Sequence, residues 1–113
     1  MNRKYSLKKT KEIDRVFHLK KSVGSKYYAI YYGPGTSSLP QIAISISKKV
    51  GNAVKRNYEK RVLREIIRPE LEYLKPQHYL IIIKKAVQEL SYLAKKEEMG
   101  KLIKKMSMYK ETK

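Results

Sequence analysis

The chain contains no cysteine and only ten acidic residues among its 113 positions. The absence of cysteine excludes disulfides and thiolate zinc sites and is compatible with a reducing compartment. No apolar run approaches the roughly 18 residues of a membrane-spanning helix, and the N-terminus lacks the apolar segment of a signal peptide. These absences lead us to expect a cytoplasmic protein with no membrane partner.

Positive charge is what the chain has in excess. Lysine and arginine number 27, which gives a formal net charge of +17, and 42% of the residues are hydrophobic. That hydrophobic content indicates a globular domain with a basic surface, not a disordered tail. So much uncompensated charge predicts an anionic partner. Nucleic acid is favoured over a membrane surface, because the apolar residues are needed for a core and ten tyrosines offer stacking surfaces.

Helical periodicity marks three segments. Residues 9–19 and 92–106 carry apolar side chains at helical spacing, with Thr10 and Ser91 as candidate N-caps. A third helix is predicted from Ala53 to Arg68, after a Gly-Asn turn and before a proline that marks its end.

Strand patterns occupy the uncharged middle of the chain and one later run. Residues 27–47 contain no charged side chain. This stretch predicts strands at 27–32 and 41–47, which we expect to pair antiparallel across a loop at 33–40. Residues 78–83 are apolar throughout, which is typical of a strand covered on both faces.

The order α-β-β-α-β-α predicts an α/β sandwich in which helices pack on one mixed sheet. We expect a single RNA-binding domain over residues 1–113, with residues 1–8 and 108–113 as flexible basic ends.

The helix at 53–68 carries the densest charge. From residue 48 to residue 68 there are eight basic and two acidic side chains. At 3.6 residues per turn, one arc of about 100° holds five polar residues: Asn57, Lys60, Arg61, Arg64 and Arg68. Another face is predicted to dock on the sheet through Val54, Tyr58, Val62 and Ile66. We predict that the polar arc contacts phosphates, because the planar guanidinium pairs with two phosphate oxygens. The alternative is a solvated basic face balanced by acids.

The segment SKKVGNAVKRNYEKRVLRE, residues 47–65, resembles the signature of the bacterial ribonuclease P protein component family. That signature specifies ten positions within sixteen, and the chain fills all of them without a gap: Lys49, Val50, Gly51, Ala53, Val54, Arg56, Asn57, Lys60, Arg61 and Arg64. The resemblance extends over residues 4–110 through the length, the basic N-terminus, an aromatic early helix and first strand, and an isoleucine-rich third strand.

The resemblance implies the protein subunit of ribonuclease P, which binds a large catalytic RNA and promotes endonucleolytic removal of the 5′ leader from precursor tRNA. It also implies the ribosomal-protein-S5-domain-2-like fold, with a left-handed crossover around the charged helix. The family's RNA-subunit contacts carry over to Arg56, Asn57, Lys60, Arg61 and Arg64. We add Arg68 from the helical arc, and Lys49 for its chemistry, which fits the leader cleft as well as the RNA subunit.

A surface that grips a single-stranded leader without reading much sequence needs aromatic faces beside cations. The family has a leader-binding cleft between the first helix and the sheet, and Phe17, Tyr28 and Tyr31 match its aromatic positions. Strand alternation prevents Tyr28 and Tyr31 from both facing that cleft unless a bulge intervenes. The resemblance favours Tyr31, because the family keeps an aromatic residue there. Core packing is the alternative for each aromatic residue. Lys48 is assigned to the leader as well, although its chemistry also fits the RNA subunit.

No catalytic or metal-binding residue is predicted. His18 and His78 have no obvious acidic partner in the sequence and are interpreted as surface or strand-edge residues, and no metal-ligand motif occurs. We expect no cofactor bound by the protein alone, and a monomer in isolation. The resemblance implies that magnesium-dependent hydrolysis belongs to the RNA. The alternative function from the residues is a ribosomal or other structural RNA-binding protein.

Overall fold

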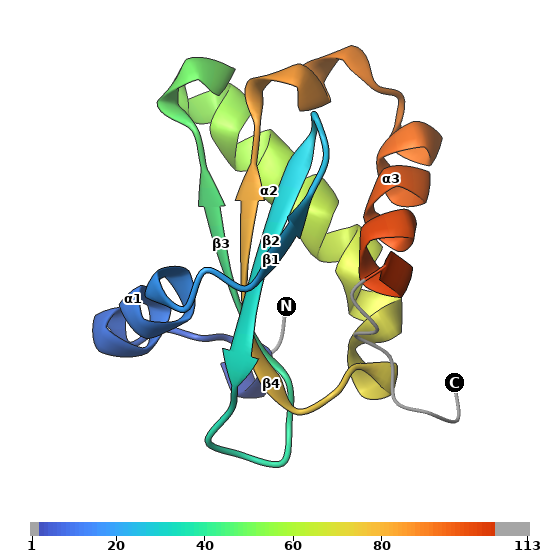
Figure 1. Cartoon of the computed structure of the whole chain (residues 1–113). Coiled ribbons are helices and arrows are strands. Elements are labelled where there is room, and N and C mark those ends of the chain that lie inside the picture. Colours follow the sequence, from blue (N-terminus) through green and yellow to red (C-terminus); the bar gives the residue numbers. More distant parts are fainter. Residues whose placement is uncertain (1–2, 106–113) are drawn as a thin grey trace.

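The computed structural model describes residues 3–105, in which three α-helices and four short 3-10 helices accompany a single sheet (Figure 1). No helix within these residues is long and apolar enough to cross a bilayer. The α-helices are α1 (Thr10–His18), α2 (Ala53–Ile67) and α3 (Tyr92–Lys105). The strands are β1 (Ser22–Gly24), β2 (Tyr28–Pro34), β3 (Gln41–Ile46) and β4 (Gln77–Ile83). The 3-10 helices are η1 (Arg3–Tyr5), η2 (Lys48–Val50), η3 (Arg68–Tyr73) and η4 (Lys85–Glu89).

The four strands form one mixed sheet in the order β1-β2-β4-β3. β2 is antiparallel to β1 and to β4, while β3 runs parallel to β4. The prediction that the strands at 27–32 and 41–47 pair with each other was therefore wrong, because β4 lies between them. β4 has the apolar character of a central strand and is buried on both faces. The sequence also gave no sign of β1, whose three residues lie at the edge of the sheet.

The connection from β3 through α2 to β4 joins two adjacent parallel strands. In Figure 1 the strands lie in front of α2 and β4 lies to the right of β3, so the crossover is left-handed. Most such connections are right-handed. The handedness expected from the resemblance is confirmed, and α2 lies on the face of the sheet opposite α1.

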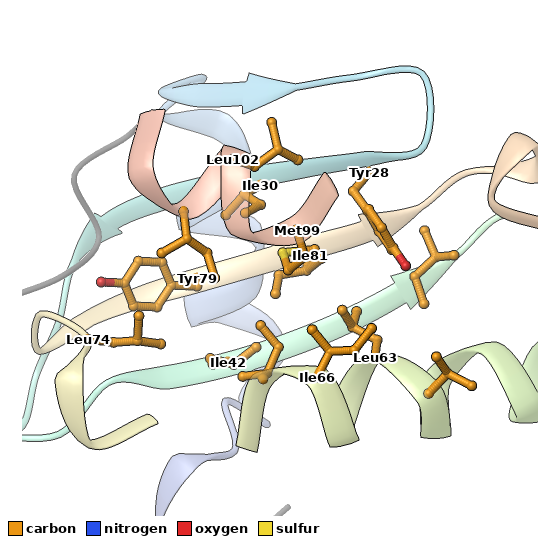
Figure 2. Packing of buried hydrophobic residues seen from close by; sticks show 14 of the residues in the cluster. Tyr28, Ile30, Ile42, Leu63, Ile66, Leu74, Tyr79, Ile81, Met99 and Leu102 are labelled. Carbon is orange, nitrogen blue, oxygen red and sulfur yellow. The ribbon is translucent and has the colours of Figure 1, made fainter. Parts of the chain in front are cut away.

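Helices cover both faces of the sheet. α2 and α3 pack on one face, where Ile30 and Ile81 from the sheet meet Leu63, Ile66 and Met99 from the helices (Figure 2). On the other face, α1 packs through Val16 on Ala43 and Leu80. The sheet is thus the middle layer of three, as expected for an α/β sandwich.

The apolar row on α2 turns out to be only half buried. Val62 and Ile66 lie in the core, but Val54 is 76% exposed and Tyr58 is 53% exposed. Residues spaced by four rotate about 40° per step around a helix. The row therefore starts facing solvent and turns into the core only from Val62 onward, which corrects our assignment of Val54 and Tyr58 to the docking face.

Residues 3–7 of the N-terminal segment contact the sheet. Residues 3–5 form η1, the Leu7 backbone N–H donates to the Ile42 carbonyl at 3.0 Å, and Leu7 is buried. Flexibility of residues 1–8 stays a prediction, although Leu7 is packed beside β3. The other expected flexible end, residues 108–113, lies outside the described residues.

Of the two predicted helix caps, one is confirmed. The Ser91 hydroxyl accepts from the Ala94 N–H at 3.2 Å. Thr10 is instead the first residue of α1, whose N-cap is Lys9. The predicted end of the last helix at residue 106 lies outside the described residues.

Candidate nucleic-acid interface

The start of α2 is fixed by local sequence. The Ser47 hydroxyl accepts from the Lys49 N–H at 3.2 Å, and the Asn52 side chain accepts from the Lys55 N–H at 3.0 Å. Between them Gly51 adopts a φ of 137°, a conformation that side-chain-bearing residues rarely adopt. A Cβ at Gly51 would also lie 2.9 Å from Lys55 Cδ. Asn52 is therefore a conventional N-cap, and Gly51 permits the sharp entry into the helix.

The outward side of α2 carries the predicted polar arc. Asn57, Arg61 and Arg64 are exposed, and Lys60 is half-buried. Arg68, also exposed, is the C-cap of α2 and the first residue of η3. None of these cations forms an ion pair within the part of the chain that the structure describes. The alternative of a basic face balanced by acids therefore does not describe this surface. Four unpaired cations along one helix make a strong local positive field, which attracts phosphates.

One of the two acidic residues of α2 is turned inward. Glu59 Oε1 lies 2.9 Å from Lys95 Nζ of α3, and the two side chains are only 6% and 5% exposed. Because Lys95 neutralises Glu59 inside the protein, this carboxylate does not offset the positive charge of the outer face. The other acid, Glu65, is exposed.

Arg56 differs from the other predicted contacts. Its side chain is half-buried, and its Nε atom is buried without a hydrogen-bond partner in the described part of the chain. It lies on the far flank of α2 from Arg61. Only part of this guanidinium therefore remains available to a phosphate.

On the opposite face of the sheet, Phe17 and Tyr31 form an aromatic pair. Their ring centroids are 5.0 Å apart, with planes inclined by 43°. Phe17, the only phenylalanine in the chain, is 45% exposed, and Tyr31 is half-buried. Protein interiors usually enclose phenylalanine. An exposed ring supported by a second ring provides a flat surface on which a base can stack.

A groove of about 220 Å³ lies beside this face, along the edge strand β3. Ile42, Ala43 and Ile44 of β3, with Ile13 of α1, supply its apolar lining. The remaining lining residues come from the N-terminal segment and from α2: Ser6, Leu7, Lys8 and Arg64.

This groove joins the polar arc of α2 to the α1 side of the sheet, which were predicted from the sequence as two separate surfaces. Arg64 belongs to the polar arc of α2, whereas Ile13 lies four residues before Phe17 on α1. Residues spaced by four lie on the same side of a helix. Ile13 of the groove therefore lies one turn from Phe17 on the same side of α1, and it packs with Tyr31 in the same hydrophobic cluster. Lys8, which sequence reasoning did not select, lies at the wall of the groove.

Tyr28 is not part of this surface. It is 1% exposed and packs in the core on the α2 and α3 side of the sheet (Figure 2). Burial raises the pKa of its hydroxyl, and the charge of Glu59 raises it further, so the hydroxyl stays neutral. The candidate leader contact at Tyr28 is therefore withdrawn, since a covered ring cannot stack on a nucleotide. Alternation along β2 is the cause, because it directs Tyr31 to the α1 side and Tyr28 away from it.

Lys48 lies at some distance from the aromatic pair. It belongs to η2, which contacts α2 and η4. In the sheet, Tyr31 lies level with Leu80 and therefore with Ala43. β3 continues for three residues beyond Ala43, roughly 10 Å along the strand, and Lys48 follows only after β3 has ended. Lys48 and Lys49, both exposed, thus belong with the start of α2.

Both histidine side chains have polar contacts with neighbouring residues. His78 was expected at a surface or strand edge but is buried in the central strand, where its Nε2 lies 3.1 Å from Gln41 Oε1 and 3.9 Å from Glu12 Oε2. His18 is exposed, with Nδ1 2.7 Å from the Asp14 carbonyl oxygen. Within residues 3–105 no three His, Asp or Glu side chains are grouped to hold a metal ion.

Comparison of the amino-acid sequence with known proteins identifies a family. A family model described as ribonuclease P matches residues 1–107. The chain is 42% identical over 104 residues to the ribonuclease P protein component of Acholeplasma laidlawii, which covers 91% of this chain and 90% of that protein. It is 34% identical over 114 residues to the component from Bacillus velezensis, covering 99% of this chain and 97% of the relative.

Solved structures share the fold. The ribonuclease P protein of Staphylococcus aureus superposes with a TM-score of 0.86 at 23% identity, over 94% of this chain and 98% of that one. The Thermotoga maritima protein, in complex with 1-(4-fluorophenyl)-2-thiourea, gives 0.78 at 22% identity, over 87% and 96%. The family match over nearly the whole length, together with these identities, shows that the chain belongs to the ribonuclease P protein component family.

Proposed function

We propose that this subunit of ribonuclease P uses the outer side of α2 to bind the catalytic RNA and the α1 side of its sheet to bind the 5′ leader of precursor tRNA. Membership of the family carries the role of ribonuclease P protein component and partnership with the ribonuclease P RNA. The same match does not favour a ribosomal or other structural RNA-binding protein. Beyond that role, we propose which surfaces bind the two RNAs, that the leader is one of the ligands, and that the protein acts in the cytoplasm.

The observation that carries the RNA contact is the row of unpaired arginines on α2. Arg61, Arg64 and Arg68 are exposed and have no acidic partner among the described residues. An arginine can pair with two oxygens of one phosphate. Lys49 and Lys60 extend the positive surface at one end and one flank of the helix, and Asn57 adds a neutral donor within it.

The leader path is supported by the groove and by the aromatic pair. A single strand is held without sequence preference by stacking on aromatic rings within a positively charged channel. Phe17 and Tyr31 supply the rings, while Lys8 and Arg64 supply cations in the groove beside them. Since Arg64 borders both surfaces, the leader and the catalytic RNA would approach each other near this residue.

The chain's contribution to the reaction is positioning and charge neutralisation. We propose that hydrolysis takes place in the RNA subunit, with magnesium held there and not by the protein. Cations that contact both RNAs reduce the repulsion between their phosphates and release condensed counterions. The protein should therefore lower the magnesium concentration that cleavage requires.

Leader cleavage at low magnesium tests the proposed function. Adding this protein to ribonuclease P RNA and precursor tRNA should raise the cleavage rate strongly over that of RNA alone. The difference should shrink at high magnesium, where free cations replace the protein's charges. Cleavage that is equally slow with and without the protein, at all magnesium concentrations, would reject the proposal.

Replacing Phe17 with alanine tests the leader path separately. We expect the complex to bind leader-bearing tRNA about tenfold more weakly, because a stacking contact is lost, and to bind mature tRNA unchanged. Affinity for both tRNAs, measured with the assembled holoenzyme, checks this. Tyr92→Ala is the matched control, since Tyr92 is equally exposed but lies on α3, on the other side of the sheet. Equal losses for both tRNAs would instead assign Phe17 a structural role.

A further inference from the structure

Tyr58 is an exposed aromatic side chain within the most basic helix of the chain. It is 53% exposed, although it was expected in the core. Lys55 and Arg61 lie three residues before and after it, so both border it on the helix surface. Both neighbours are exposed and without ion pairs in the described part of the chain. An aromatic ring between two cations is the arrangement that binds unpaired nucleotides.

The ring is also held from below. Lys95 Nζ of α3 lies 5.4 Å from the centroid of the Tyr58 ring, within the range of a cation–π contact. Lys95 is itself fixed by its 2.9 Å ion pair with buried Glu59. Tyr58 thus rests on a buried charged group that restrains it, so little conformational freedom remains to be lost on binding.

We infer that Tyr58 is a stacking site for an unpaired base of the ribonuclease P RNA, at the edge of the α2 contact surface. The inference rests on the proposed RNA contact of α2 and adds a non-electrostatic element to it. Lys55 and Arg61 would hold the phosphates on either side of the base while the ring covers its face. Val54, one turn earlier and 76% exposed, would extend the apolar area beneath the neighbouring sugar.

Binding of Tyr58 variants to the ribonuclease P RNA tests this inference. Tyr58→Leu, which removes the aromatic face, should weaken binding about 5- to 150-fold. Tyr58→Phe keeps the face and should bind like the original protein. Because no charge is lost, the slope of log affinity against log salt should stay the same for both. Tyr73→Leu is the matched control, since Tyr73 is similarly exposed but lies beside Glu70 and Glu72.

Fluorescence supplies a second, independent measurement. The chain contains no tryptophan, so Tyr58→Trp introduces a single reporter at this position. Stacking on a base should quench its emission when ribonuclease P RNA is added, whereas Tyr73→Trp should change little. Circular dichroism of each variant verifies the fold.

The outcomes separate this inference from the proposed function. Unchanged affinity of Tyr58→Leu, or unquenched Tyr58→Trp emission in the complex, would overturn the stacking site. If removal of the α2 arginines weakens binding in the same assay, the proposed RNA contact stands even then. If neither Tyr58→Leu nor removal of the arginines weakens RNA binding, both the stacking site and the proposed RNA contact are rejected.

Discussion

Replacing Arg61, Arg64 and Arg68 together by alanine is expected to reduce affinity for the ribonuclease P RNA on the order of 10³-fold. Each side chain is exposed and unpaired in the described structure, so each is free to make a charge-assisted contact of about 1.5 kcal/mol or more. Arg61 and Arg64 lie on one face of α2, Arg68 caps its C-terminal end, and the three would engage neighbouring phosphates. Titration of labelled RNA at fixed magnesium measures the loss.

Salt dependence shows whether the loss comes from phosphate contacts. Each phosphate contact contributes roughly 0.7–0.9 to the slope of log affinity against log salt, so the triple variant should flatten it by about two to three units. The matching Arg→Lys variant retains the charges but not the planar fork. It should keep the slope while losing part of the affinity. The urea midpoint should barely move for either variant.

A second comparison controls for net charge. Alanine at Lys96, Lys104 and Lys105 removes the same charge from exposed positions on α3. Because these positions lie on another helix, we expect a much smaller loss of affinity. Equal losses in the two triple variants would show that RNA binding depends on total charge alone and would contradict the assignment of α2.

Replacing Lys95 with alanine is expected to lower the free energy of unfolding by about 3–5 kcal/mol. The Lys95–Glu59 pair is almost completely buried, with 2.9 Å between Nζ and Oε1. Removing Lys95 leaves the Glu59 carboxylate without its counter-charge in the interior, and it also removes the support beneath Tyr58. Since domains of this size are stable by only about 5–15 kcal/mol, the loss should be visible directly in urea unfolding.

Two further variants distinguish charge burial from simple loss of packing. Lys95→Met combined with Glu59→Leu removes both charges and fills the space, so stability should largely return, because apolar replacements of buried pairs are often neutral. Lys101→Ala breaks the exposed pair with Glu98, whose atoms are 3.7 Å apart. That change should cost less than about 0.5 kcal/mol. A double variant as unstable as Lys95→Ala would refute the account based on an uncompensated charge.

Much of the local structure is readable from the sequence because its signals act over a few residues. The start of α2 follows from Gly51 and Asn52, whose conformational freedom and capping side chain are local properties. The three α-helices were predicted to within about one residue at each described end. Alternation along one strand predicted that Tyr31 and Tyr28 face opposite sides of the sheet, whereas the preference for Tyr31 on the α1 side rested on the family resemblance.

Pairing between strands was harder to predict from the sequence. The hydrophobic pattern of residues 41–47 is compatible with any neighbouring strand, so it does not distinguish β2 from β4 as the partner of β3. β4 occupies the central position because it is apolar and buried on both faces, and it therefore separates β2 from β3. β1 owes its existence to backbone pairing with β2, because its three residues carry no strand pattern of their own.

The sequence by itself determined which helix carries the cations, how that helix begins, and the family signature that spans it, since each depends on residues that are close along the chain. The tertiary structure alone decided that Glu59 is withdrawn into a buried pair, that Tyr58 and Val54 face solvent, and that Arg64 meets the α1 side in one groove. These features depend on how α2 is rotated against the sheet and against α3. That rotation is set by the fit of the whole core, to which residues distant in sequence contribute at once.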